Sequence, residues 1–194
     1  EQGKPLSVEL LWQLKRIGSP VVSPSGEHII APVTEYDLKE DKGSTQLWRF
    51  DGEGKNNRAI TVKGLKVSEP VFSPDGKQLA FLWQSNAVVP YSNSKLKVLT
   101  LNSKNISDIA ADFDRSIEQP AWLSNSSFVV QYDDRGQRKL AALTTKGKLT
   151  ELTASLGGVS QPQPYLSGSY SVSDNGVIAF THGTSTRPAD VALP

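Results

Sequence analysis

Four copies of one strand–turn–strand motif, placed at a constant interval along the chain, predict an all-β fold made of β-propeller blades. Pro20, Pro70 and Pro120 stand at the same point of the first three copies, so the repeat is 50 residues long. A second observation is the turn chemistry inside each copy, and a third is that only one short segment has a helical pattern.

Each copy reads as a short apolar run, a polar turn and a β-rich run. Proline sets φ for an early turn position, Asp and Asn bond their own backbone, and Gly adopts positive φ at low cost. The copies therefore predict hairpins. Their turns are Ser23-Pro24-Ser25-Gly26, Ser73-Pro74-Asp75-Gly76, Ser124-Asn125-Ser126-Ser127 and Ser173-Asp174-Asn175-Gly176.

Further strand candidates lie between the copies and raise the expectation to four strands per unit. They are 45–50, 95–101 and 138–143, each followed by a polar turn and then by 58–62, 106–110 or 149–153. Four antiparallel strands per repeat form one propeller blade, whereas the alternative, a β-sandwich, is favoured when no motif repeats. We expect blades at 19–67, 68–117 and 118–167 and a partial one at 168–194, all part of a larger propeller.

The one helix candidate is Ser7 to Ile17, where Leu10, Leu11, Leu14 and Ile17 share a face and Ser7 can cap the N-terminus. We interpret residues 1–18 as a lead-in packed against the first blade or another domain.

The composition excludes several classes of function. The 21 basic and 20 acidic residues give a net charge of +1 without long charge runs, which argues against a nucleic-acid partner. The absence of cysteine excludes disulfides and thiolate chemistry and is compatible with an extracytoplasmic (periplasmic or secreted) location. No apolar stretch approaches the length of a membrane span, so no membrane partner is expected.

The segment Ser73-Pro74-Asp75-Gly76-Lys77-Gln78-Leu79-Ala80-Phe81 resembles the blade motif shared by TolB-type propellers and prolyl oligopeptidase family serine peptidases. The opening stretch 5–24 is similar to the leading helix and first blade of acylaminoacyl-peptidase-like and dipeptidyl-peptidase-like members. The segments 112–116, 133–136 and 184–190 resemble late-blade segments of that subgroup. The resemblance also suggests a junction within 84–90, where blades of the full family propeller are missing.

In that family the propeller precedes an α/β-hydrolase domain, caps its active site and admits short peptides. The resemblance therefore implies the N-terminal propeller part of an exo- or oligopeptidase whose hydrolase domain lies beyond Pro194, and a chain that is inactive alone. Its expected partners are that hydrolase domain and peptide substrates. The alternative is a non-enzymatic, TolB-like propeller that binds protein partners.

The residues themselves offer no complete catalytic centre. A hydrolase nucleophile needs Gly-x-Ser-x-Gly, and the nearest segments, around Ser160 and Ser185, lack the second glycine. Of the two histidines, His28 is expected on a strand surface and His182 in a loop after a strand. We assign no catalytic, cofactor-binding or metal-ligating residue, and no cofactor.

Two clusters of charged residues and the four tryptophans are also candidates for a binding role. The first group is Asp112, Asp114 and Arg115, and the second is Asp133, Asp134 and Arg135; ion pairing is expected for both, with cation or substrate binding as the alternative. We expect Trp48, Trp83 and Trp122 to pack between blades, and Trp12 to make an interdomain contact.

Overall fold

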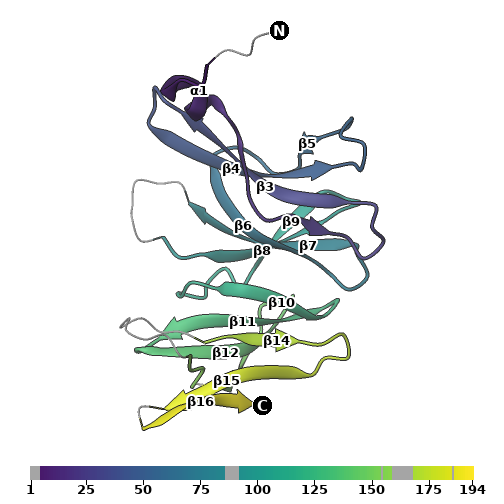
Figure 1. Cartoon of the computed structure of the whole chain (residues 1–194). Coiled ribbons are helices and arrows are strands. Elements are labelled where there is room, and N and C mark those ends of the chain that lie inside the picture. Colours follow the sequence, from purple (N-terminus) through teal and green to yellow (C-terminus); the bar gives the residue numbers. More distant parts are fainter. Residues whose placement is uncertain (1–4, 86–91, 154, 159–167, 185) are drawn as a thin grey trace.

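The computed structural model describes residues 5–85, 92–153, 155–158, 168–184 and 186–194. Figure 1 shows antiparallel sheets that follow one another from the N-terminal to the C-terminal end of the chain. The all-β architecture with one short N-terminal helix, α1 (Val8–Gln13), is thereby confirmed. The junction suggested at 84–90 lies outside the described residues, except for its first two positions.

The first and second sheets hold nine strands in chain order. Within the first sheet, β1 and β2 both pair with the same edge of β3, so together they form one interrupted edge strand. Its strands are β1 (Arg16–Ile17), β2 (Val21–Val22), β3 (Ile29–Asp37), β4 (Lys42–Phe50) and β5 (Arg58–Ala59); those of the second are β6 (Leu65–Phe72), β7 (Gln78–Ser85), β8 (Lys95–Thr100) and β9 (Asn105–Ile109).

The third and fourth sheets continue the same meander. The third has four strands, and the fourth has three within the described residues. They are β10 (Glu118–Ser124), β11 (Ser127–Asp134), β12 (Gln137–Thr144) and β13 (Leu149–Thr153), followed by β14 (Tyr170–Val172), β15 (Ile178–Thr184) and β16 (Arg187–Ala192).

The turn serine explains why the motif repeats. Ser73 Oγ accepts a hydrogen bond from Gln78 N–H at 3.0 Å, and the Ser73 carbonyl accepts one from Gly76 N–H at 2.8 Å. Gly76 has a φ of 68°, which a side chain would strain. The same bonds form at Ser23 with His28 and Gly26, and at Ser173 with Val177 and Gly176.

The core consists of apolar layers between consecutive sheets. In β7, Leu79 and Phe81 pack toward the first sheet, while the alternating Ala80 and Leu82 pack toward the third. In β11, Phe128 packs toward the second sheet, and the following residue, Val129, packs against the fourth. Strands buried on both faces need continuous apolar runs, which is what the sequence of these strands provides.

The structure corrects the expected length of the lead-in helix. Its N-terminus is as predicted, because Ser7 Oγ accepts a hydrogen bond from Leu10 N–H at 3.2 Å. The helix ends at Gln13 instead of continuing to Ile17, since Arg16 and Ile17 pair with β3 and this pairing requires extended backbone. Leu14 and Ile17, expected on a packed face, are exposed, although α1 does contact β3.

Candidate functional site

The first strand of each sheet lies where the sheets meet. The contacts between consecutive sheets include the pairs β2 and β6, β6 and β10, and β10 and β14, each of which joins two first strands. We call the side of the molecule formed by these strands the inner edge.

A β-bulge interrupts the inner-edge strands at the repeated proline. The register shifts between Ser68 and Val71 in β6, and between Glu118 and Ala121 in β10. At each bulge the proline is buried while the residue before it, Glu69 or Gln119, is exposed and has positive φ, 51° and 47° respectively. A bulge frees backbone groups from the ladder, so these residues can bond to neighbouring sheets.

The backbone of Gln119, in the third sheet, forms hydrogen bonds to the second and fourth sheets. Its backbone N–H donates to Glu69 Oε2 at 2.9 Å, which ties the third sheet to the second. Its carbonyl accepts a hydrogen bond from the Tyr170 hydroxyl of the fourth sheet, and that hydroxyl also lies 2.9 Å from the carbonyl oxygen of Val129. We name Glu69, Gln119 and Tyr170 the inner-edge site.

The surroundings of Glu69 and Tyr170 raise the pKa of both side chains. Partial desolvation raises the pKa of Glu69, and the charge of Glu118 raises it further, while the bond from Gln119 opposes the shift. Burial also raises the pKa of Tyr170, and the Glu69 carboxylate adds to this. Glu69 makes no ion pair within the described residues, so it is the carboxylate of this site that is available to a cation.

A chain of hydrogen-bonded side chains from the third sheet holds the side chain of Gln119 in place. The Gln131 side chain is fully buried, and its Nε2 donates to Gln119 Oε1 at 3.0 Å. Arg138 Nη1 donates to Gln131 Oε1 at 3.3 Å, and Arg138 itself makes a bidentate pair with Asp133 (2.9 and 3.1 Å) and a 3.0 Å ion pair with Glu118. Since Glu118 is paired with Arg138, Glu69 is the one of these two carboxylates without an ion pair among the described residues.

The two charged groups singled out in the sequence meet one another. Arg115 donates to Asp134 Oδ1 from Nε and Nη2 at 3.0 and 2.9 Å, and Lys139 Nζ lies 3.2 Å from Asp134 Oδ2. These two cations lower the pKa of Asp134. Ion pairing, the first expectation from the sequence, is therefore present. In the part of the chain that the structure describes, Asp112 and Arg135 make no ion pair.

The two histidines considered for catalysis lie at different sheets, the first and the fourth. Ser160 and Ser185 lie outside the described residues. His182 belongs to β15 and pairs with Asp190 of β16, so the expectation of a loop position was wrong; the strand continues because residues 155–157 and β16 both bond to it. His28 comes directly before β3, where the Ser23 turn holds its backbone.

The tryptophans behave in two ways. Trp122 is buried, and its ring centroid lies 4.0 Å from that of Phe128, with the two rings tilted by 40°. Its Nε1 donates to the Val71 carbonyl at 3.0 Å, so it packs between blades as expected. Trp83 also packs against the apolar layer between the first and second blades, as expected. Trp48 and Trp83 are both half-buried, each beneath a lysine side chain. Trp12 is partly exposed and contacts Tyr36 edge-to-face, and its interdomain role stays a prediction.

The sequence did not single out the inner-edge site, although it carried a signal. Glu69 and Gln119 both precede the repeated proline and are separated by one full repeat. Equivalent positions in neighbouring blades lie close together in a repeat protein, so polar residues at such positions are candidates for contact with each other.

No family model matches the chain. A curated relative, probable dipeptidyl-peptidase 5 of Emericella nidulans, is 32% identical over 141 residues, which cover 73% of this chain and 19% of that protein. The chain thus spans about a fifth of the relative's length. This chain belongs to the prolyl oligopeptidase family, as part of a propeller domain.

Solved structures agree on the propeller fold. A puromycin-hydrolysing peptidase of Mycobacterium tuberculosis aligns with a TM-score of 0.68 at 17% identity and covers 92% of this chain and 29% of that one. The propeller domain of the Pyrococcus furiosus Trilobed protease gives 0.65 at 14% identity, covering 94% and 55%. TolB of Acinetobacter baumannii gives 0.60 at 21%, covering 92% and 41%. The sheets are therefore blades of a propeller.

Proposed function

We propose that this chain is part of the propeller of a serine peptidase and limits access of substrates to an α/β-hydrolase domain encoded beyond Pro194. The observation that carries the proposal is the 32% identity with a dipeptidyl-peptidase over 141 residues, together with the polar inner edge of the blades. The catalytic serine, aspartate and histidine would belong to the hydrolase domain, and the chain described here would select substrates.

Glu69 is the residue of the inner edge best suited to contact a peptide substrate. It is an exposed carboxylate at the inner edge without an ion pair among the described residues, and only one of its oxygens is bonded to Gln119. A carboxylate in such a place attracts a cation, and the cation that a short peptide offers is its free α-amino group. We therefore propose that Glu69 contributes to binding the amino end of the substrate.

The test uses the full-length protein of the parent gene with dipeptidyl chromogenic substrates. We expect Glu69→Gln to raise KM for substrates with a free amino end by about tenfold, as is usual when a bond to a charged group is lost. KM for N-acylated analogues should not change. Glu53→Gln, an equal charge change in an exposed loop of the first blade, is the control. Equal KM values for wild type and Glu69→Gln would contradict the role of Glu69.

The access-limiting role has a separate readout. Wild-type protein should cleave short peptides and spare long polypeptides, because the blades narrow the path to the hydrolase. Loss of the ties at Gln119, in the double variant Glu69→Ala and Tyr170→Phe, should increase cleavage of long polypeptides relative to short ones. If the ratio stays constant, the blades do not limit access.

The alternative, a partner-binding propeller without a hydrolase domain, draws on the likeness to TolB. The parent gene decides between the two. A hydrolase sequence with Gly-x-Ser-x-Gly after Pro194 supports the peptidase proposal, and a stop codon there overturns it.

We also propose an extracytoplasmic location, consistent with the absence of cysteine. No helix of the described residues is long and apolar enough to cross a membrane. Cell fractionation with an antibody against the chain tests the location, and recovery in the cytoplasm would contradict it.

A further inference from the structure

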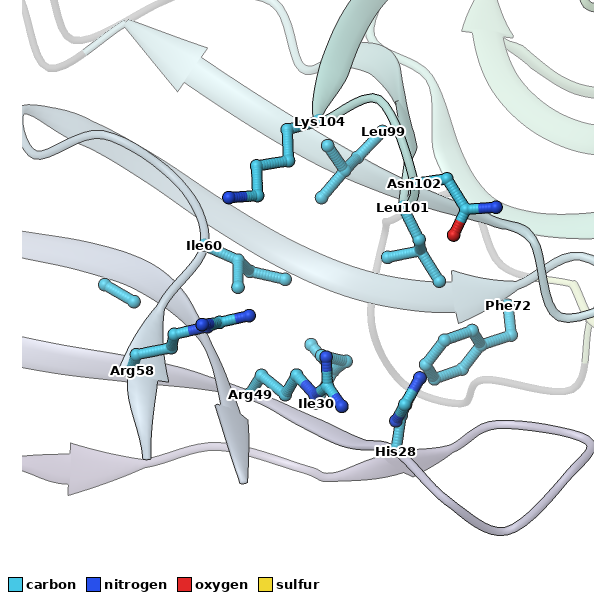
Figure 2. Close-up of a pocket in the computed structure, with 11 residues that line it drawn as sticks. His28, Ile30, Arg49, Arg58, Ile60, Phe72, Leu99, Leu101, Asn102 and Lys104 are labelled. Carbon is cyan, nitrogen blue, oxygen red and sulfur yellow. The ribbon is translucent and has the colours of Figure 1, made fainter. Parts of the chain in front are cut away.

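A pocket of about 280 Å³ lies between the first and second blades, on the side of the β2–β3 turn. Figure 2 shows that its lining comes from both blades. The floor is apolar: Ile30 of the first blade faces Phe72 and Leu99 of the second, and all three are at least nine-tenths buried. The pocket is separate from the inner-edge site.

Basic side chains surround this apolar floor. Arg49 and Arg58 come from β4 and β5 of the first blade, and Lys104 comes from the β8–β9 turn of the second. Figure 2 shows Arg58 and Lys104 directing their charged ends into the space between the blades. No acidic residue lines the pocket, and none of the three cations makes an ion pair within the described residues.

The register places two of these cations against each other. Arg49 lies directly opposite Arg58 across the β4–β5 ladder, so both point to the same face of the sheet. Like charges at directly opposed positions destabilise a sheet, and here nothing within the described residues compensates them. A bound anion would supply the missing negative charge.

His28 also lies at this pocket. Its side chain lines the same pocket, and its buried Nδ1 has no hydrogen-bond partner in the described part of the chain. A buried polar atom without a partner is uncommon in a folded protein and calls for an explanation. Nδ1 is inaccessible to solvent, so the imidazole ring would have to turn before a ligand in the pocket could bond to it.

We propose that this pocket binds a small organic anion, an apolar group that carries a carboxylate or a phosphate. The apolar part would lie on Ile30, Phe72 and Leu99, and the anionic group would lie between Arg49, Arg58 and Lys104. Guanidinium groups suit both anions because they donate two parallel hydrogen bonds to carboxylate or phosphate oxygens. The volume is near the lower limit of small-molecule sites, so the ligand must be small.

The first test is calorimetric titration of the purified 194-residue chain with 3-phenylpropionate and with phenyl phosphate, which distinguish the two anionic groups. We expect saturable binding of at least one of them. The neutral analogue 3-phenylpropanamide lacks the anionic group, and inorganic phosphate lacks the apolar group. Each should therefore bind at least about tenfold more weakly. No saturable binding of either organic anion, or equal binding of the amide, would overturn the proposal.

Two variants and one control locate the binding. Arg58→Gln and Lys104→Gln should each weaken binding by about tenfold, the usual effect of losing a charge-assisted hydrogen bond. Lys39→Gln makes the same charge change in the β3–β4 turn, at the opposite end of the first blade, and should leave the affinity unchanged. Wild-type affinity in both pocket variants would show that the anion binds elsewhere.

A measurement without ligand tests the charge argument. Arg58→Gln should raise the melting temperature of the ligand-free chain, because it removes one of two opposed cations, and should reduce the rise that the anion causes in wild type. Lys39→Gln should change neither. A lower melting temperature for ligand-free Arg58→Gln would overturn the claim that the cations repel one another. Circular dichroism verifies that each variant is folded.

Discussion

The carboxylate of Glu69 accepts a hydrogen bond from the backbone N–H of Gln119, the residue at the same place one repeat later. Gln119 in turn accepts a bond from Tyr170 of the following blade. Three blades are thus joined through a single bulged residue. This arrangement makes the ties between blades directly testable by substitution.

Glu69→Gln should keep the bond to Gln119 and remove the partially desolvated charge. We expect Glu69→Gln to be as stable as wild type or slightly more stable at neutral pH, and Glu69→Ala to lose about 1 kcal/mol, the usual value of one hydrogen bond. Urea unfolding measures both. Equal losses in the two variants would show that the carboxylate is required for its charge.

The raised pKa of Glu69 also predicts a pH dependence. A carboxyl whose folded-state pKa is raised contributes stability that is fully present below its ordinary pKa and is lost as pH rises through the folded value. The stability of Glu69→Gln relative to wild type should therefore increase from about pH 4 to about pH 7. Unfolding curves at these two pH values test the direction, and a decrease would contradict it.

Tyr170→Phe should weaken the tie between the third and fourth blades. The variant removes a hydroxyl that bonds the carbonyls of Gln119 and Val129, so we expect a loss of about 1–3 kcal/mol of unfolding free energy. Tyr36→Phe, which removes an exposed hydroxyl at the first blade, is the matched control and should cost less. Hydrogen exchange in β15 should rise in Tyr170→Phe alone.

Gly157→Ala should destabilise the fourth blade. A Cβ at residue 157 would lie 2.6 Å from the backbone nitrogen of Gly183, so one of the two strands must move, at a cost of about 1–3 kcal/mol. Gly52→Ala is the control, since a Cβ there meets nothing within 4 Å. If both variants unfold at the same urea concentration, the backbones at 157 and 183 are not in close contact.

The chain alone should hydrolyse neither aminoacyl nor acyl-aminoacyl chromogenic peptides. It contains no Gly-x-Ser-x-Gly segment, and a serine nucleophile needs that strained turn together with a histidine base. Treatment with a fluorophosphonate probe, followed by mass spectrometry, checks this. Covalent labelling of any serine in the chain would contradict the prediction.

Much of the fold could be predicted because its signals are local. The serine, proline and glycine residues of the turns act through bonds that span only a few positions, as at Ser73, Gly76 and Gln78. Alternating burial on both faces of β7 and β11 follows equally from their apolar runs. The end of α1 could not be predicted, because a tertiary pairing of Arg16 and Ile17 with β3 outweighs the helical pattern.

The sequence by itself determined the repeat, the hairpins and the blade fold, since each rests on residues close together in the chain. Only the tertiary structure decided that Glu69 and Gln119 take positive φ before proline, where an isolated chain prefers extended backbone, because bonds between blades hold them there. It alone also placed Arg49 opposite Arg58 and brought Lys104 from the next blade beside them, since register and blade packing bring together charges that are far apart in the sequence.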